Sequence, residues 1–297
     1  MRAAAAAPLV LALLLLGPVP ARAWGFDVHR LLMDRAIDLL PDTIRPFFQK
    51  HRAFIVERSV DPDLWRTAGW TEEPPRHFVD LDAYGQPPFA GVPREYDRAV
   101  EQYGADFVQR NGTLPWRVSE IYGQLTRNFE LQKKGPPGYS LENIKFFSAI
   151  LGHYVSDGHV PFHAVLNYDG QLTGQRGIHS RWETDLVLLN RDALRIAPPP
   201  LTRIGDPRAY MFEVLEASFP LAAVILKADK AAVAGRAAYD DEYYGHLFAE
   251  TRPILEQRLS EAASGIASMI VSCWEAGGRP DLPLEPKREL RRVRRQR

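Results

Sequence analysis

HYVSDGHVPFH, residues 153–163, is the most informative stretch of this 297-residue sequence. His153 precedes Asp157 by four residues, so the two side chains share one face if this stretch is helical. Pro161 disfavours a helical conformation of the residue before it and turns the chain. His163 then follows from that turn. The stretch therefore predicts the end of a helix that carries a His and a carboxylate, followed by a further His.

A second pair with the same spacing lies in GIHSRWE, residues 177–183, where His179 precedes Glu183 by four residues. Neutral imidazoles and carboxylates together are a ligand set that suits zinc. A single His–acid pair is more often a contact on a solvated helix face. Two pairs and a further His within thirty-one residues favour a metal site that could hold two ions.

The first 23 residues are typical of a signal peptide. A short positive start is followed by an apolar run over residues 3–16, and Ala21-Arg22-Ala23 resembles a cleavage site. The alternative is an uncleaved membrane anchor, but the apolar run is short for a spanning helix. We expect a secreted or periplasmic protein whose mature chain begins at Trp24. No later stretch is expected to be long and apolar enough to cross a bilayer.

A further set of candidate ligands lies upstream. The amine and carbonyl oxygen of Trp24 could chelate a metal, and His29 follows five residues later. Asp63 lies in SVDPDLWR, and His77 follows it by fourteen residues. Taken alone, Trp24 would be a buried anchor and Asp63 a turn residue.

Composition indicates an ordinary soluble protein, with 45% apolar and 25% charged residues. Cys273 is the only cysteine, so no intramolecular disulfide can form, and any metals are expected to be bound by His, Asp and Glu rather than by thiolates. Residues 287–297 hold seven basic residues and one acid, which leaves 28 basic and 36 acidic residues in the rest of the mature chain, a net charge of −8. A protein domain with this negative charge binds phosphate poorly unless divalent cations change the charge locally.

Apolar periodicity predicts an all-α fold. The expected helical stretches are 28–40, 94–103, 116–133, 141–158, 179–193, 206–228 and 240–274. Residues 58–92 are rich in Pro, Gly and Asp and are expected to form a long ordered loop. The prediction is one multi-helix domain over residues 24–280, followed by a basic, disordered tail over 281–297.

In their order along the chain, these motifs resemble the bacterial zinc-dependent phospholipases C and the fungal-type single-strand-specific zinc nucleases. Both groups are all-helical, use an N-terminal Trp as a ligand and bind three zinc ions, which implies a three-zinc site between helices here. By this resemblance, the first zinc is held by Asp63, His77, His153 and Asp157. The second is held by His163, His179 and Glu183. The third is held by the Trp24 amine and carbonyl, His29 and a bridging Asp157.

The resemblance implies hydrolysis of a phosphodiester. Zinc activates a water molecule that attacks phosphorus in line, and Asp63 acts both as a ligand and as the base toward that water. Arg66 and Arg181 lie close in sequence to ligands, where they could contact phosphate or form ordinary ion pairs. His159 is expected to lie beside the cluster and to support a ligand.

Two details favour a phospholipase C that acts on a phospholipid headgroup. Glu183 stands where the nucleases carry Asp, and Asp27 falls where the phospholipases have an acid that faces choline. The five-residue step from Trp24 to His29 favours the alternative, a single-strand nuclease or 3'-nucleotidase, as does His159. A nuclease also needs aromatic side chains for base stacking, and the candidates are Trp65, Trp70, Phe78, Tyr84 and Phe89.

A third hypothesis is a non-catalytic binding protein that keeps the metal cluster for stability. A zinc protease is disfavoured because the sequence contains no His-Glu-x-x-His motif. The basic tail could attract the protein to an anionic membrane, and no obligate protein partner is evident. The expected substrate is thus phospholipid, with single-stranded nucleic acid as the alternative.

Overall fold

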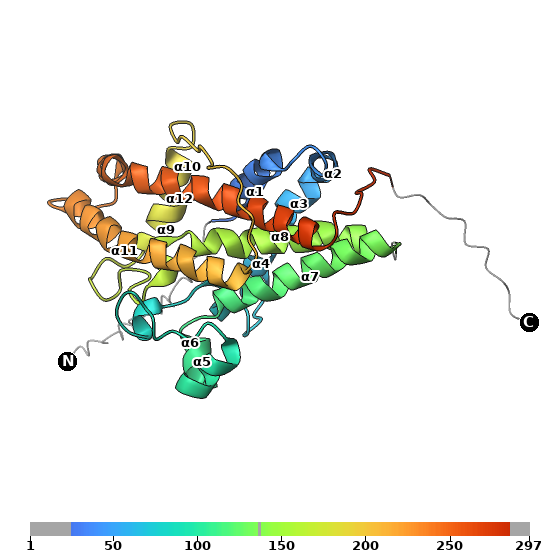
Figure 1. The fold of residues 1–297 in the computed structure, drawn as a ribbon. Helices are drawn as coiled ribbons and strands as arrows, with labels where there is room; N and C mark the ends of the chain where they lie inside the picture. The colour runs from blue at the N-terminus through green and yellow to red at the C-terminus, as the bar shows by residue number, and fades with distance from the viewer. Residues whose placement is uncertain (1–24, 136–137, 286–297) are drawn as a thin grey trace, which may run out of the picture.

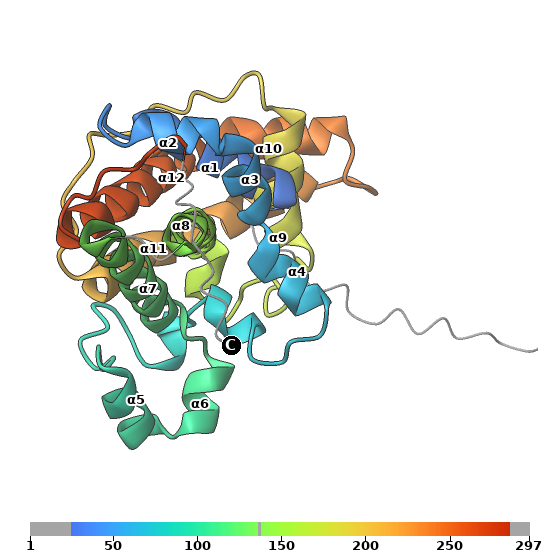
Figure 2. The same ribbon diagram turned by 90° about the vertical axis from the view of Figure 1, so that its right-hand side faces the viewer.

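Helix α8, Ser140–Gly158, is the central element of the computed structural model, which describes residues 25–135 and 138–285. It packs against α7 (Leu114–Lys134), α12 (Asp241–Ala276) and α1 (Phe26–Leu39). In Figure 2 it is seen end-on, with the other long helices around it. Its second half, which carries HYVSDG, is buried throughout. The motif predicted from sequence therefore lies inside the helical assembly.

The all-α prediction is confirmed, since the described residues form helices and turns and contain no strand. Every stretch predicted to be helical contains helix, and the stretch at 179–193 forms α9, a π-helical turn (Arg181–Asp185) and α10 before it ends in a turn over 190–193. The remaining α-helices are α2 (Arg45–Lys50), α3 (Arg52–Arg58), α4 (Asp61–Thr67), α5 (Tyr96–Tyr103), α6 (Ala105–Arg110), α9 (Ile178–Ser180), α10 (Leu186–Leu189) and α11 (Pro207–Val233).

The segment 58–92, expected to be a loop throughout, contains helix α4 and two 3-10 turns, η1 (Pro74–His77) and η2 (Leu81–Ala83). Proline in the first turn and two aspartates there favour helix formation in α4. The rest of the segment is irregular and is fixed by backbone hydrogen bonds, such as that from the Val79 N–H to the His163 carbonyl at 2.9 Å.

An extended strap, residues 194–206, joins α10 to α11 and crosses α12 (Figure 1). Its backbone N–H groups donate to serine hydroxyls of α12, with Ala197 to Ser260, Thr202 to Ser268 and Ile204 to Ser272. Serines spaced by four or eight residues lie on one face of a helix, so α12 presents a row of acceptors to the strap.

Helix α11 corrects the expectation that no later stretch could cross a membrane. It is 27 residues long and its most apolar window has a mean hydropathy of 1.6, although 39% of that window is buried inside the fold. It packs against α7, α12 and the 3-10 turn η3 (Pro161–Ala164), as a core helix does.

The predicted signal peptide, Trp24 and most of the predicted tail, residues 286–297, lie outside the described residues.

Candidate metal centre

Eight of the nine predicted ligands are described, and they converge from seven elements onto one region of the fold. α8 contributes two, and α1, α4, η1, η3, α9 and the π-helical turn contribute one each. All eight side chains are buried, with at most 4% of any residue exposed: His29, Asp63, His77, His153, Asp157, His163, His179 and Glu183. The ninth, Trp24, lies outside the described residues.

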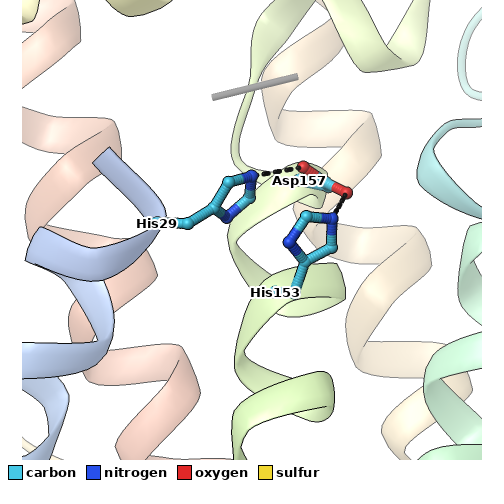
Figure 3. A group of neighbouring side chains, drawn as sticks. All are labelled: His29, His153 and Asp157. Atoms are coloured by element: carbon cyan, nitrogen blue, oxygen red, sulfur yellow. Dashed lines mark ion pairs between the residues drawn. The ribbon is translucent and has the colours of Figure 1, made fainter. Parts of the chain in front are cut away.

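The first group joins α1 to α8 and is shown in Figure 3. His29 Nε2 lies 3.6 Å from Asp157 Oδ1, and His153 Nε2 lies 3.3 Å from Asp157 Oδ2. The two imidazole rings stack at 3.9 Å between centroids. The ligand atoms of these three residues lie close enough together to hold a metal ion.

The second group shares His153 with the first and adds Asp63 and His77. His77 Nδ1 lies 3.2 Å from His153 Nε2, 4.0 Å from Asp63 Oδ1 and 2.9 Å from Asp157 Oδ2. Asp157 therefore faces both groups, one oxygen toward His29 and the other toward His77.

The third group consists of His163, His179 and Glu183. His179 Nε2 lies 3.0 Å from a Glu183 oxygen, and the rings of His163 and His179 meet edge to face at 5.0 Å. The π-helical turn over Arg181–Asp185 carries Glu183, and such wide turns are frequent at functional sites. The spacing of four residues thus brings this pair together even though the helix is not regular.

Backbone and hydroxyl oxygens fix the orientation of three imidazoles. His153 Nδ1 donates to the Ser59 carbonyl at 2.8 Å, and His163 Nδ1 donates to the His77 carbonyl at 2.7 Å. The Ser156 hydroxyl donates to the His153 carbonyl, so His29 Nδ1 donates to Ser156 Oγ at 2.8 Å. A proton on each Nδ1 leaves a lone pair on each Nε2, as metal ligation requires.

Several buried polar atoms of the centre make no hydrogen bond within the described part of the chain. They include His29 Nε2, Asp157 Oδ1 and both ring nitrogens of His179, whose 3.0 Å contact with Glu183 lacks hydrogen-bond geometry. Buried polar atoms without partners are rare in folded proteins. A bound cation would satisfy atoms of this kind, so the donor set fits a metal.

Protonation of the centre also suits a metal. Burial lowers the pKa of His163 to about 3 and that of His179 to about 4, and burial and His153 hold the pKa of His29 well below its usual value. These imidazoles are neutral at pH 7. Burial would lower the pKa of His77 as well, but hydrogen bonds to Asp157 and Glu73 raise it to about 9. The carboxylates that favour a proton there also favour a bound cation.

Glu73 belongs to the centre and was missed from sequence. Its side chain is fully buried, lies 3.5 Å from His77 Nε2 and accepts hydrogen bonds from Tyr154 and, at 2.8 Å, from Arg76. Burial opposes its charge, but the nearby His77 and the hydrogen bond from Tyr154 lower its pKa to about 2. Glu73 and His77 are four residues apart, which is the spacing that identified the other pairs.

A cavity of about 450 Å³ opens onto the centre. Two arginines line it, Arg66 and Arg110, and Arg66 also pairs with Asp63 Oδ1 at 2.9 Å. Arg181 is not part of it, because its guanidinium is buried against Tyr243 and Asp229. Of the two arginines considered from sequence, only Arg66 faces the cavity, and Arg110 was not foreseen.

The cavity wall also contains Asp80 and three aromatic side chains, Phe78, Phe162 and Tyr168. Asp80 is 6% exposed, and burial together with the nearby Asp82 raises its pKa to about 8. At neutral pH this carboxyl group is therefore mostly protonated and uncharged.

Most of the other residues predicted from sequence to lie at the site do not line this cavity. Asp27 is exposed and pairs with Arg30 on the outside of α1, so it does not face the cavity. His159 donates to the Val155 carbonyl and lines a separate cavity between α11 and α12, not the metal centre. Among the aromatic candidates, Phe78 lines the cavity and the others do not: Tyr84 and Phe89 lie in the core, and Trp65 and Trp70 stack on each other.

Compared with known proteins, the chain matches no family model and no curated sequence.

Proposed function

We propose that this protein is an exported, zinc-dependent phosphodiester hydrolase. The observation that carries the proposal is the convergence of three buried ligand groups, two of which contribute histidines to the wall of a cavity that two arginines also line. Five imidazoles among the eight ligands favour zinc over magnesium or calcium, which prefer oxygen ligands. Three groups support the three zinc ions that the sequence resemblance implies.

When bound, zinc supplies Lewis acidity toward phosphate oxygens and lowers the pKa of water. The residues of the chain supply the rest. Asp63 accepts the proton of the attacking water, since its carboxylate lies in the second ligand group beside the cavity. Arg66 and Arg110 donate hydrogen bonds to the non-bridging oxygens of the phosphate, for which guanidinium groups are suited.

Trp24 is proposed to complete the group of His29 and Asp157 through its amine and carbonyl oxygen. Support comes from its neighbour, Gly25, which is buried and donates its N–H to Thr184 Oγ1 at 3.0 Å. A Cβ on Gly25 would lie 2.6 Å from the Thr184 methyl group, so glycine permits this close approach. Thr184 follows Glu183 directly, which ties the chain at Gly25 to the centre.

The substrate is proposed to be either a phospholipid or a single-stranded nucleic acid. The motif that ends in Glu183 supports the phospholipase C type, but Asp27 gives that choice no support. The cavity favours a nucleic acid, because aromatic walls stack on bases and a protonated Asp80 can donate a hydrogen bond to a base. An uncharged Asp80 and two arginines are also poor partners for a choline cation.

One experiment tests both the class and the substrate. The mature chain that begins at Trp24 is purified, its zinc content is measured, and phosphatidylcholine micelles are assayed beside single-stranded DNA and RNA. Nucleotide release without diacylglycerol release assigns the nuclease type, and the reverse assigns the phospholipase C type. A chain that binds zinc yet hydrolyses neither these substrates nor bis(p-nitrophenyl) phosphate would instead be a metal-stabilised binding protein.

A further inference from the structure

A second cavity, of about 370 Å³, lies between α11, α12 and the strap, and the proposed hydrolysis does not use it. Its buried wall carries a charge, because Arg258 of α12 faces it and is only 2% exposed. His159, Tyr210 and Ser264 line the same cavity. A buried guanidinium that faces a cavity is unusual in a structural core, where charges are paired.

The charge of Arg258 is only partly compensated. One guanidinium nitrogen pairs with Glu261 at 2.9 Å, but Nε makes no hydrogen bond within the described residues although it is fully buried. Glu261 is itself 34% exposed in its side chain, so water weakens the pair. Burial lowers the pKa of Arg258, which indicates that the charge lacks sufficient acceptors.

The cavity lies where the row of hydrogen bonds from strap N–H groups to α12 serines, here called the ladder, is interrupted. Ser260 and Ser268 each accept a hydrogen bond from a strap amide. Ser264 lies one turn from each of them, but the strap there consists of Pro199 and Pro200, which have no N–H to donate. The two prolines and Ser264 line the cavity, and so does Arg258, which lies six residues before Ser264 on α12.

The other residues that line the cavity indicate the chemical class of its ligand. Pro199, Pro200 and Leu221 give the cavity apolar surface, and the acids Glu213 and Glu261 also line it. A bare inorganic anion gains too little from one arginine that already pairs with Glu261, whereas the charge of Glu213 is exposed to water and screened. A ligand must offer an acceptor to Arg258 and bury apolar surface at the same time.

We propose that this cavity binds a small carboxylic acid with an apolar body, whose carboxylate pairs with Arg258 and whose body lies against Pro199 and Pro200. Carboxylate and guanidinium form strong, charge-assisted hydrogen bonds, which would give the partly compensated charge of Arg258 a second acceptor beside Glu261. Burial of the apolar body excludes water and strengthens that pair. The ligand competes with Glu261 for the guanidinium.

Octanoate is the probe, and the test uses the full mature chain with its metal. Binding is followed by calorimetry and by the NMR resonance of the Arg258 Nε–H, with octanol as the uncharged control. We expect saturable octanoate binding that shifts this resonance, and binding of octanol at least ~10-fold weaker, because hydrogen bonds to charged groups contribute about 1.5–3 kcal/mol. Arg258→Met should weaken octanoate binding by a similar factor.

Two variants at accessible positions keep the test decisive if Arg258→Met fails to fold. Glu261→Gln removes the competing carboxylate and should tighten octanoate binding severalfold. Ala217→Trp places a large side chain at the exposed lining of the cavity and should abolish binding. Unchanged binding by Ala217→Trp would locate octanoate elsewhere, including the metal centre, and would overturn the proposal. Absence of saturable binding to the unaltered chain would overturn it as well.

Discussion

Asp157 faces two ligand groups at once, with Oδ1 3.6 Å from His29 and Oδ2 2.9 Å from His77. Asp157→Asn keeps the shape of the side chain and removes its charge. We expect loss of zinc from both groups and a fall in bis(p-nitrophenyl) phosphate hydrolysis of more than ~100-fold, because even supporting residues around a metal contribute about 10–100-fold. Zinc content by mass spectrometry and the hydrolysis rate check this.

The control is Asp106→Asn, which changes an exposed acid on α6. It should keep the zinc content and the rate of the unaltered chain. Full zinc and full activity in Asp157→Asn would remove Asp157 from the metal centre.

We expect Glu73 to support a bound metal through His77, whose Nε2 lies 3.5 Å away. Glu73→Gln weakens this contact and lets the imidazole rotate or change tautomer. We expect zinc affinity to fall about 10–100-fold in a competition titration with a chelator. Glu72→Gln is the matched control, since Glu72 is exposed and adjacent in sequence. Equal affinities in the two variants would contradict the supporting role of Glu73.

His159 makes folding stability depend on pH. Burial, and to a smaller extent Arg258, lower its pKa from 6.5 to about 3, so it is neutral when folded but takes up a proton in the unfolded chain below pH 6.5. Its contribution is therefore complete above pH 6.5 and is lost as the pH falls toward 3. The slope is at most about 1.4 kcal/mol per pH unit for one proton.

His159→Asn should show a shallower loss of unfolding free energy between pH 6.5 and 4.5 than the unaltered chain, measured by urea unfolding. His246→Asn, at an exposed histidine on α12, should show the same loss as the unaltered chain. Parallel curves for His159→Asn and the unaltered chain would show that His159 does not titrate on unfolding.

At the scale of elements, the long helices could be predicted because several turns repeat the apolar pattern. α2, α3 and α6 were not predicted, since six or seven residues show too little periodicity. The His–acid pairs were recognisable because one helical turn joins their members. Arg110 and Asp80 were not, because tertiary contacts alone bring them to the cavity. Glu73 can be recognised in the sequence only by its spacing of four residues from His77.

The ladder between the strap and α12 gives a prediction at this scale. Ser272→Ala leaves the buried N–H of Ile204 without its acceptor, which costs about 1–3 kcal/mol of unfolding free energy. Ser264→Ala is the matched control, because no strap amide donates to Ser264. Urea unfolding of both variants should show a clear loss only for Ser272→Ala. An equal loss of unfolding free energy in both variants would mean that the hydrogen bond from the Ile204 N–H to Ser272 does not stabilise the fold.

At the scale of the molecule, an acidic protein is a poor binder of negatively charged phosphate. The proposed phosphate chemistry therefore depends on the metal centre, where bound cations would change the local charge. The carboxylates of Asp63, Asp157 and Glu183 are buried in groups that could hold metal ions, which would bring positive charge to this part of the protein. The buried centre also joins α1, α4, η1, η3 and the segment of α9 to α8. Metal binding is therefore expected to stabilise the arrangement of the whole chain as well as to provide the reactive group.

The proposed role of Trp24 links the fold to export. An α-amine ligates a metal only when it is free, and any residue before Trp24 converts it to an amide that cannot. A mature chain with one additional alanine before Trp24 should bind one zinc fewer and lose most of its hydrolysis, whereas one additional alanine after Arg297 should change neither. Removal of the extra alanine by an aminopeptidase should restore both properties. Full zinc content and rate in the extended chain would show that Trp24 is not a ligand, while the other two groups would stand unaffected.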